Sequence, residues 1–159
     1  MEFDLLPALI AGFVGTVAMT VGMTMGKSMG MTTMDIALIG GGMMSGDERK
    51  ARRAGMFIHL IVMGTLVFGS IYAFLFQALE SASWVTGLIV GVVHGAVVGI
   101  MAMPMMGAIH PRMMPAAEGF QLDPPGIMGV NYGRGTPLGL LMGHAVYGVV
   151  VALVYSGLV

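Results

Sequence analysis

The chain has 159 residues, of which 57% are hydrophobic and only 9% are charged, and its formal net charge is −1 at pH 7. A soluble domain carries about 25% charged residues because water must wet its surface. This composition therefore excludes a water-soluble globule and predicts a single membrane domain over residues 1–159. The absence of cysteine excludes disulfides and thiolate metal sites. The near-neutral charge, without a basic run, excludes nucleic acid as a partner.

Four segments have the length and apolarity needed to cross a membrane, about 20 mostly apolar residues each. They are residues 5–26, 54–79, 84–107 and 137–158, and none has Asp, Glu, Lys or Arg in its interior. The sequence therefore predicts an all-α protein, a bundle of four transmembrane helices.

The connections between these segments differ in kind. In the first loop, Thr33 is expected to cap a short interfacial helix that ends at the glycine run of residues 40–42. The second loop is a tight turn before Trp84, an aromatic residue typical of a membrane interface. The third loop is rich in Pro and Gly but carries little charge, so we expect it to fold back against the membrane face.

Charge placement predicts the orientation in the membrane. All seven basic residues lie in or beside two loops: Lys27, Arg49, Lys50, Arg52 and Arg53 in the first, and Arg112 and Arg134 in the third. Basic loops stay in the cytoplasm, so both termini are expected outside, and the lipid bilayer is an expected partner. The acidic first residues lack the basic region of a cleaved signal peptide.

A weak internal repeat relates the spans in pairs. Span one from Gly15 aligns with span three from Gly95, and spans two and four each show Gly, His, Gly and Tyr in that order. This pattern indicates two tandem helical hairpins related by an axis along the membrane normal. The alternative is that Gly, Val and Met recur by chance in membrane helices.

Several short motifs resemble a known family. They are "GTVAMT" in span one, "MDIALIGG" in loop one, "HG" in span three, and "NYG" and "GHAVYG" around span four. Together they resemble an uncharacterised family of small four-helix integral membrane proteins of bacteria and archaea, a domain of unknown function. The resemblance implies the four-helix fold and a prokaryotic inner-membrane location, and it implies no activity.

Glycines recur every four residues along span three, at Gly87, Gly91, Gly95 and Gly99. This spacing leaves one helix face without side chains, so that another helix can approach closely. The partner helix is either internal or belongs to another subunit. So much glycine in four short spans favours a homo-oligomer or a larger membrane complex.

Three histidines lie inside the predicted spans, where ionisable residues are costly and count as functional candidates. At about 1.5 Å per residue, His59 and His144 lie about 7 and 10 Å from the cytoplasmic boundary, and His94 about ten ångströms further out. His59 and His144 are candidate axial ligands of haem b, with His94 a further cofactor-binding candidate. His110, at the interface, needs no special role.

Methionine is concentrated in the predicted cytoplasmic half. The candidate metal ligands there are Met19, Met23, Met63, Met101 and Met105. Thioether and imidazole groups suit Cu(I), so a layer of methionine and histidine is a candidate copper site. The alternative is that methionine fills irregular gaps between helices with no metal bound.

No catalytic motif accompanies these groups. The spans hold no carboxylate or lysine to relay protons, and no hydrolytic or nucleotide-binding arrangement is present. A stand-alone enzyme is therefore not expected. The first functional hypothesis is an accessory or assembly subunit of a larger membrane complex of respiratory type. The alternatives are a Cu(I)-binding or transporting protein and a protein that binds haem b or a pigment.

Overall fold

The computed structural model describes residues 2–115 and 118–159, which form helices and loops without a strand among them. In this part of the chain, four long helices are apolar enough to cross a membrane. In chain order they are α1 (Leu5–Ser28), α3–η1–α4 (Glu48–Phe57, Ile58–Phe68, Gly69–Ala78), α5–η2–α6 (Trp84–Val97, Val98–Ala102, Met103–Ile109) and α7 (Thr136–Ser156). The prediction of four long apolar helices is confirmed.

Local sequence explains where the third long helix begins and ends. The Ser83 hydroxyl accepts a 3.1 Å hydrogen bond from the Thr86 amide, which satisfies a free N–H of the first turn. At the other end the helix stops at Ile109, two residues before Pro111. Proline disfavours a helical conformation in the residue before it, so the chain turns there.

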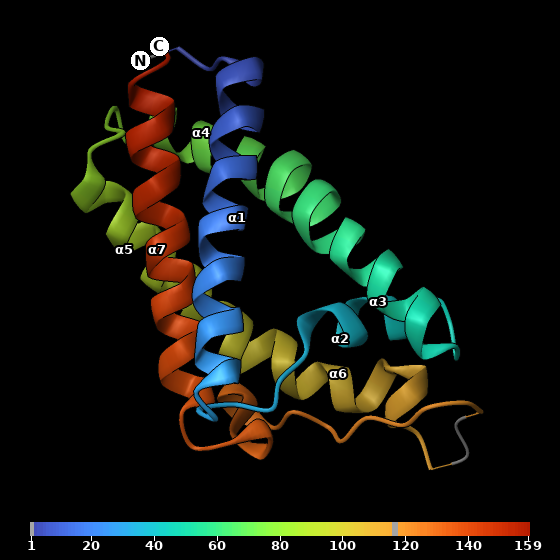
Figure 1. The fold of residues 1–159 in the computed structure, drawn as a ribbon. Helices are drawn as coiled ribbons and strands as arrows, with labels where there is room; N and C mark the ends of the chain where they lie inside the picture. Colours follow the sequence, from blue (N-terminus) through green and yellow to red (C-terminus); the bar gives the residue numbers. More distant parts are fainter. Residues whose placement is uncertain (1, 116–117) are drawn as a thin grey trace.

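The two chain ends lie side by side. α1 and α7 run antiparallel next to each other, and α5 packs against α7 (Figure 1). The Asp4 amide donates a 3.0 Å hydrogen bond to the Tyr155 hydroxyl, which in turn donates to the Glu2 carbonyl at 3.2 Å. We refer to this end of the molecule as the terminal end and to the opposite end as the loop end.

Two of the long helices lean away from α1 and α7 toward the loop end, as α3 and α6 show in Figure 1. The short helix α2 (Ile36–Gly42) fills the space between them. It packs so closely on α3 that a Cβ atom on Gly41 would overlap the Ala51 carbonyl, and one on Gly55 would overlap the Ala37 carbonyl. The helix expected in loop one therefore exists, but it is partly buried between helices.

The prediction that Thr33 caps this helix is wrong. The cap is Asp35, whose carboxylate accepts a 3.1 Å hydrogen bond from the Leu38 amide. Thr33 instead bonds the third loop, because its amide and its hydroxyl both donate to the Tyr132 carbonyl, at 2.7 and 3.1 Å. The glycine run at 40–42 belongs to the last turn of the helix.

His110 connects the third long helix to α2. Its side chain is fully buried, its Nε2 donates a 2.8 Å hydrogen bond to the Ile39 carbonyl, and its Nδ1 accepts from the Arg112 amide at 3.1 Å. The neighbouring loop holds two short 3₁₀ turns, η3 (Pro111–Met113) and η4 (Ile127–Tyr132). His110 is thus a structural residue with both ring nitrogens engaged.

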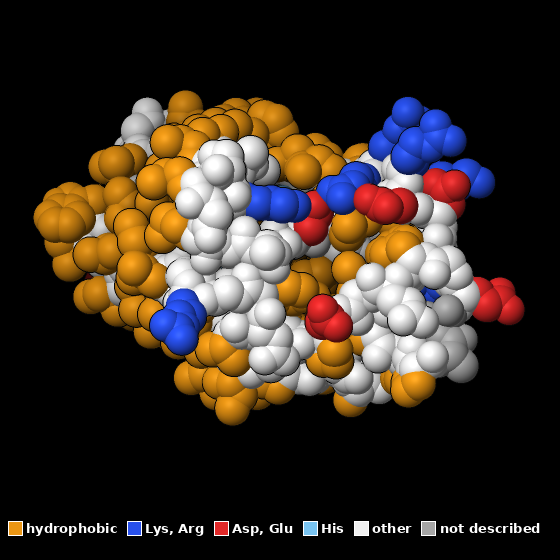
Figure 2. All heavy atoms as spheres, turned by 60° about the horizontal axis from the view of Figure 1, so that its bottom comes forward, with side chains coloured by type: hydrophobic (Ala, Val, Ile, Leu, Met, Phe, Trp, Pro, Cys, Tyr) orange, Lys and Arg blue, Asp and Glu red, His pale blue; other side chains and the backbone are white. Residues whose placement is uncertain are grey.

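Two apolar clusters hold the helices together. One lies toward the terminal end and includes Tyr72, Phe76, Tyr147 and Tyr155. The other lies toward the loop end and is built from Met34, Ile39, Met103, Met113, Tyr132 and Leu140. Lys and Arg side chains gather at the loop end, where Figure 2 shows them beside acidic groups, whereas the flanks of the long helices are covered with apolar side chains.

Candidate functional site

The glycine face of α5 is occupied within the chain. A Cβ atom on Gly87 would overlap the Gly148 carbonyl oxygen, and one on Gly91 would overlap the His144 carbonyl oxygen. Both obstacles are backbone atoms of α7, which cannot move aside as a flexible side chain can. This face therefore binds α7 of the same molecule and is not free to bind another subunit.

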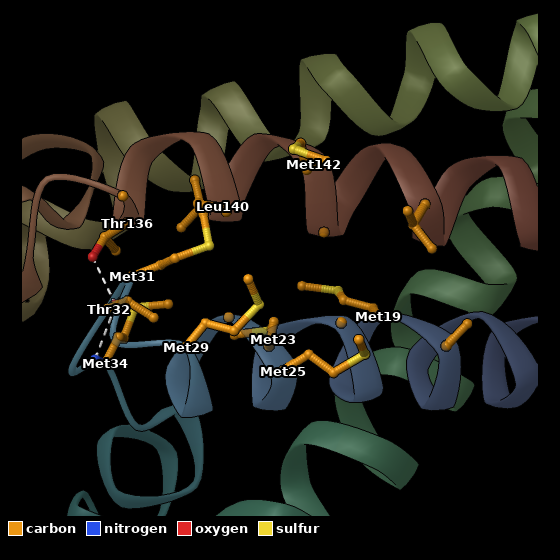
Figure 3. Close-up of a pocket in the computed structure, with 17 residues that line it drawn as sticks. Met19, Met23, Met25, Met29, Met31, Thr32, Met34, Thr136, Leu140 and Met142 are labelled. Carbon is orange, nitrogen blue, oxygen red and sulfur yellow. Dashed lines mark hydrogen bonds between the residues drawn. The ribbon is translucent and has the colours of Figure 1, made fainter.

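A second set of glycines faces open space. A Cβ atom on Gly22, Gly26 or Gly139 would meet nothing within 4 Å. These glycines line a pocket of about 260 Å³ between α1, the segment 29–34 and α7. Seven methionines also line it: Met19, Met23, Met25, Met29, Met31, Met34 and Met142. We call this pocket the methionine groove (Figure 3).

The methionine groove is open to the outside and is almost entirely apolar. Met25, Met29 and Met142 are 58%, 72% and 56% exposed, whereas Met19 at its inner end is only 7% exposed. Its polar groups include Thr32 and Thr136, whose hydroxyls hydrogen bond to each other at 2.7 Å. Such a surface can bind an apolar partner or, through its sulfur atoms, a soft cation.

The methionines predicted as metal ligands divide between two environments. Met19 and Met23 lie in the methionine groove, where both are next to the Cβ position of Gly143. Met63, Met101 and Met105 lie outside it on exposed helix faces, at 39%, 66% and 52% exposure. The structure therefore does not bring the five predicted ligands together.

The other groove methionines were missed because most of them follow the predicted end of span one. Gly30, with φ +74°, sends the chain back along α1 after Ser28. This turn brings Met31 and Met34 beside α1 and α7. A usable signal was the run of methionines through residues 23–34, read together with a glycine at a sharp turn.

His59 is engaged by a threonine on α1. The Thr20 hydroxyl donates to the Thr16 carbonyl at 2.6 Å, so its oxygen is free to accept the 3.1 Å hydrogen bond from His59 Nε2. The Nε2 atom that would bind haem iron is thus already hydrogen bonded to Thr20. Neither His59 nor His144 lines the methionine groove.

His94 lies directly against His144. The two ring centres are 4.6 Å apart and the planes meet at 78°. The estimate that placed His94 about ten ångströms further out counted a rise of about 1.5 Å per residue along each span. Because α6 runs sideways at the loop end (Figure 1), the residues after His94 do not all extend the helix along the direction of α1 and α7. The count of residues therefore overestimates the depth of His94. The ring partner of His144 is therefore His94, not His59.

A charged site lies beside the groove, in a pocket of about 270 Å³ that Met23 and Met34 also line. Asp35 accepts hydrogen bonds from Lys27, at 2.6 Å, and from Arg52. Burial alone raises the pKa of the Asp35 carboxyl, but the bonds from Lys27, the Leu38 amide and Arg52 outweigh it and lower the pKa below its ordinary value. Asp35 is therefore a structural anion that holds α1, α2 and α3 together.

The part of the chain that the structure describes has no cluster of side chains suited to a hard metal ion. Within residues 2–115 and 118–159, no three His, Cys, Asp or Glu side chains gather as a metal site would require. The methionine groove has no carboxylate, histidine or lysine in its lining. Its lining can therefore contact apolar groups or offer methionine sulfur atoms as soft ligands.

Comparison of the chain with protein-family models, curated protein sequences and solved structures gives no match in any of the three. Membership of the four-helix family that the short motifs resemble stays a prediction. A proposal for the function therefore rests on the arrangement and chemistry of the chain's own residues.

Proposed function

We propose that this protein is a non-catalytic accessory subunit of a larger membrane complex, and that its methionine groove receives a transmembrane helix of a partner. One observation carries this proposal. Gly22, Gly26 and Gly139 leave open space in the groove, whereas Gly87 and Gly91 are filled from within the chain. An open glycine surface on an otherwise packed molecule is where a further helix can approach closely.

The proposal places the four long helices across the membrane as a bundle of two tandem hairpins. Their outer faces carry exposed Leu, Ile, Val and Phe side chains, which lipid tolerates and water does not. The basic side chains gather at the loop end (Figure 2). By the positive-inside rule the loop end is cytoplasmic and both termini are outside. The groove then opens to lipid in the cytoplasmic half of the membrane.

The shape of the groove suits a helix. Gly22 and Gly26 are four residues apart on α1, so about one turn of that helix presents no side chain to the groove, and Gly139 leaves open space on α7. A partner helix can lie over this shallow surface while flexible methionines adjust to its side chains. The charges needed for an enzyme are absent from the lining. Binding without catalysis is what this surface offers.

The test is to fill the groove without disturbing the fold. Gly22→Leu and Gly139→Leu each place a Cβ atom where nothing lies within 4 Å, and the rest of the leucine side chain enters the open pocket. The chain should therefore fold with unchanged thermal stability. In native membranes these variants should lose the larger assembly, measured by native gel electrophoresis of mildly solubilised protein. The matched control is Val93→Leu on α5, which is 57% exposed and outside the groove.

Crosslinking from single positions tests where on the surface the partner binds. A photo-crosslinker placed at Met25 in the groove should join the chain to one membrane protein, and one placed at Ile89 on α5 should not. The Gly22→Leu and Gly139→Leu changes should abolish the Met25 product. Assemblies of unchanged size in both glycine variants, with equal crosslinking from both positions, would contradict the proposal.

A second candidate function is Cu(I) binding by the groove, favoured by its seven thioether side chains. Replacing Met29, Met31 and Met142 together by leucine keeps the apolar volume but removes three sulfur atoms. If the groove holds copper, this triple variant should lose it from the purified protein while keeping its partner. If the groove only docks a helix, both the copper content and the assembly should be unchanged.

A further inference from the structure

One buried ring nitrogen in the middle of the molecule has no partner. His94 Nε2 is inaccessible to solvent and makes no hydrogen bond, although the Nδ1 atom of the same ring lies 3.2 Å from the Tyr72 hydroxyl. A buried polar atom left unpaired costs about 1–3 kcal/mol. Such an atom in a native protein calls for an explanation, and a role as a ligand is one of the few available.

The neighbouring histidine is held with its corresponding nitrogen free. His144 Nδ1 donates a 2.8 Å hydrogen bond to the Leu140 carbonyl, one turn earlier on α7. A neutral imidazole carries one N–H, so the Nε2 atom of His144 bears the lone pair. A ring N–H bonded to a backbone carbonyl, with the opposite nitrogen free, is the usual arrangement of a histidine that binds a metal.

The two rings are already close to the geometry of a shared ion. Their centres are 4.6 Å apart with planes at 78°. With metal–nitrogen bonds of about 2.0 Å, two imidazoles share one ion in a bent arrangement when their ring centres are about 5 Å apart. The separation of the two ring centres therefore lies within an ångström of that value. Phe68, at 4.1 Å from the His94 ring centre, and Tyr72 limit other movements of that ring.

We propose that His94 and His144 bind one Cu(I) ion through their Nε2 atoms. The ligand set is neutral, and no charged residue lies in the α5 segment around His94 or in α7. The cost of burying an ion rises with the square of its charge, so a divalent ion costs about four times as much as a monovalent one. Cu(I) is monovalent, accepts imidazole nitrogen and tolerates low coordination numbers.

This site goes beyond helix docking and uses none of the sulfur ligands of the second candidate function. It nevertheless lies next to the inner end of the methionine groove, because Met19 packs against Gly143, the residue before His144. Tyr72 is a positioning residue, since its hydroxyl oxygen accepts from the Nδ1–H group of His94 in the tautomer that leaves the lone pair on Nε2.

The experiment measures Cu(I) itself on the purified full chain in mild detergent with ascorbate, by competition with a chromophoric Cu(I) chelator. The wild type should bind one equivalent, and the copper X-ray absorption spectrum should show nitrogen neighbours with imidazole scattering. His94→Gln and His144→Gln should each weaken binding at least about tenfold, and Tyr72→Phe by roughly tenfold. His59→Gln is the matched control and should bind as the wild type does, because its Nε2 is engaged by Thr20.

Folding and the groove are separated by two further measurements. Thermal unfolding without copper identifies any variant that fails to fold. Added Cu(I) should raise the unfolding temperature of the wild type and of His59→Gln, but not that of His94→Gln or His144→Gln. The Met29, Met31 and Met142 triple leucine variant should keep the equivalent of copper. Folded His94→Gln and His144→Gln variants with wild-type affinity, or a spectrum with sulfur neighbours only, would overturn the histidine site while leaving helix docking intact.

Discussion

The hydroxyl group of Tyr147 donates a 2.8 Å hydrogen bond to the carbonyl oxygen of Gly64, 83 residues away along the chain. Gly64 lies in η1, where the helix widens so that the amide of Gly69 bonds back to the same carbonyl, five residues earlier. The tyrosine ring also packs edge-on against Tyr72 at 5.0 Å between ring centres. One buried side chain of α7 thus holds the second long helix by its backbone.

Tyr147→Phe should isolate the contribution of that hydrogen bond, because the ring and its contact with Tyr72 remain. The net value of a buried hydrogen bond is about 1 kcal/mol, so we expect a loss of that size in unfolding free energy. Tyr147→Leu should cost clearly more, since it also removes the aromatic packing. Thermal unfolding of the purified variants measures both. Equal stability of wild type and Tyr147→Phe would show that the bond contributes nothing.

A methyl group on the α5 glycine face should destabilise the fold, whereas one in the groove should not. Gly91→Ala places its Cβ atom on the His144 carbonyl oxygen, and overpacking of this kind costs about 1–3 kcal/mol. Gly139→Ala meets nothing within 4 Å and gains helix propensity, so its unfolding temperature should equal or exceed that of the wild type. The reverse order of the two unfolding temperatures would contradict the packing of α5 on α7.

Because of Asp35, the folded protein should lose stability at acid pH. Its pKa is lowered in the folded protein, so its contribution is present above the ordinary aspartate pKa of 3.8 and is lost as pH falls through the lower folded value. Asp35→Asn should be less stable at pH 7, because Lys27 and Arg52 lose their anion. Unfolding temperatures from pH 6 to pH 2.5 should therefore fall for the wild type and converge with those of Asp35→Asn. Parallel curves would exclude this role.

Single cysteines test the orientation, since the chain has no native cysteine. Lys50 on α3 and Val159 at the terminal end are both exposed. If the basic loop end faces the cytoplasm, a membrane-impermeant maleimide should label Val159→Cys in intact cells and Lys50→Cys only after lysis. The opposite labelling pattern would place the methionine groove in the outer half of the membrane.

The long helices could be predicted from the sequence because an apolar run of about 20 residues has few alternatives once water is excluded. Local signals placed the ends of the third helix within a few residues, as Ser83 and Pro111 show, whereas the second helix begins at Glu48 and not at the predicted residue 54. Thr33 was mistaken for a cap because Thr33 and Asp35 both suit that position, and only the Tyr132 carbonyl on a distant loop decides between them.

The candidate sites were harder to predict, because their members belong to different helices. His94 and His144 were placed at different depths by counting residues, and the tilt of the helices brought them together. Met19 and Met23 could be placed beside each other, since they share one face of a single helix. Met31 and Met34 could not, because a turn at Gly30 returns them to that helix. Periodicity within one helix can be predicted locally, but the angles between helices cannot.

Because the first residues of the chain bond to Tyr155 in the last helix, the two ends of the chain lie close together. The Tyr155 hydroxyl contacts backbone groups of Glu2 and Asp4, so a short linker would span the gap between residues 2 and 159. New ends could then be opened in the turn at residues 79–83, which joins α4 to α5. Such a circular permutant would keep each described helix and exchange only the order in which the two hairpins are synthesised.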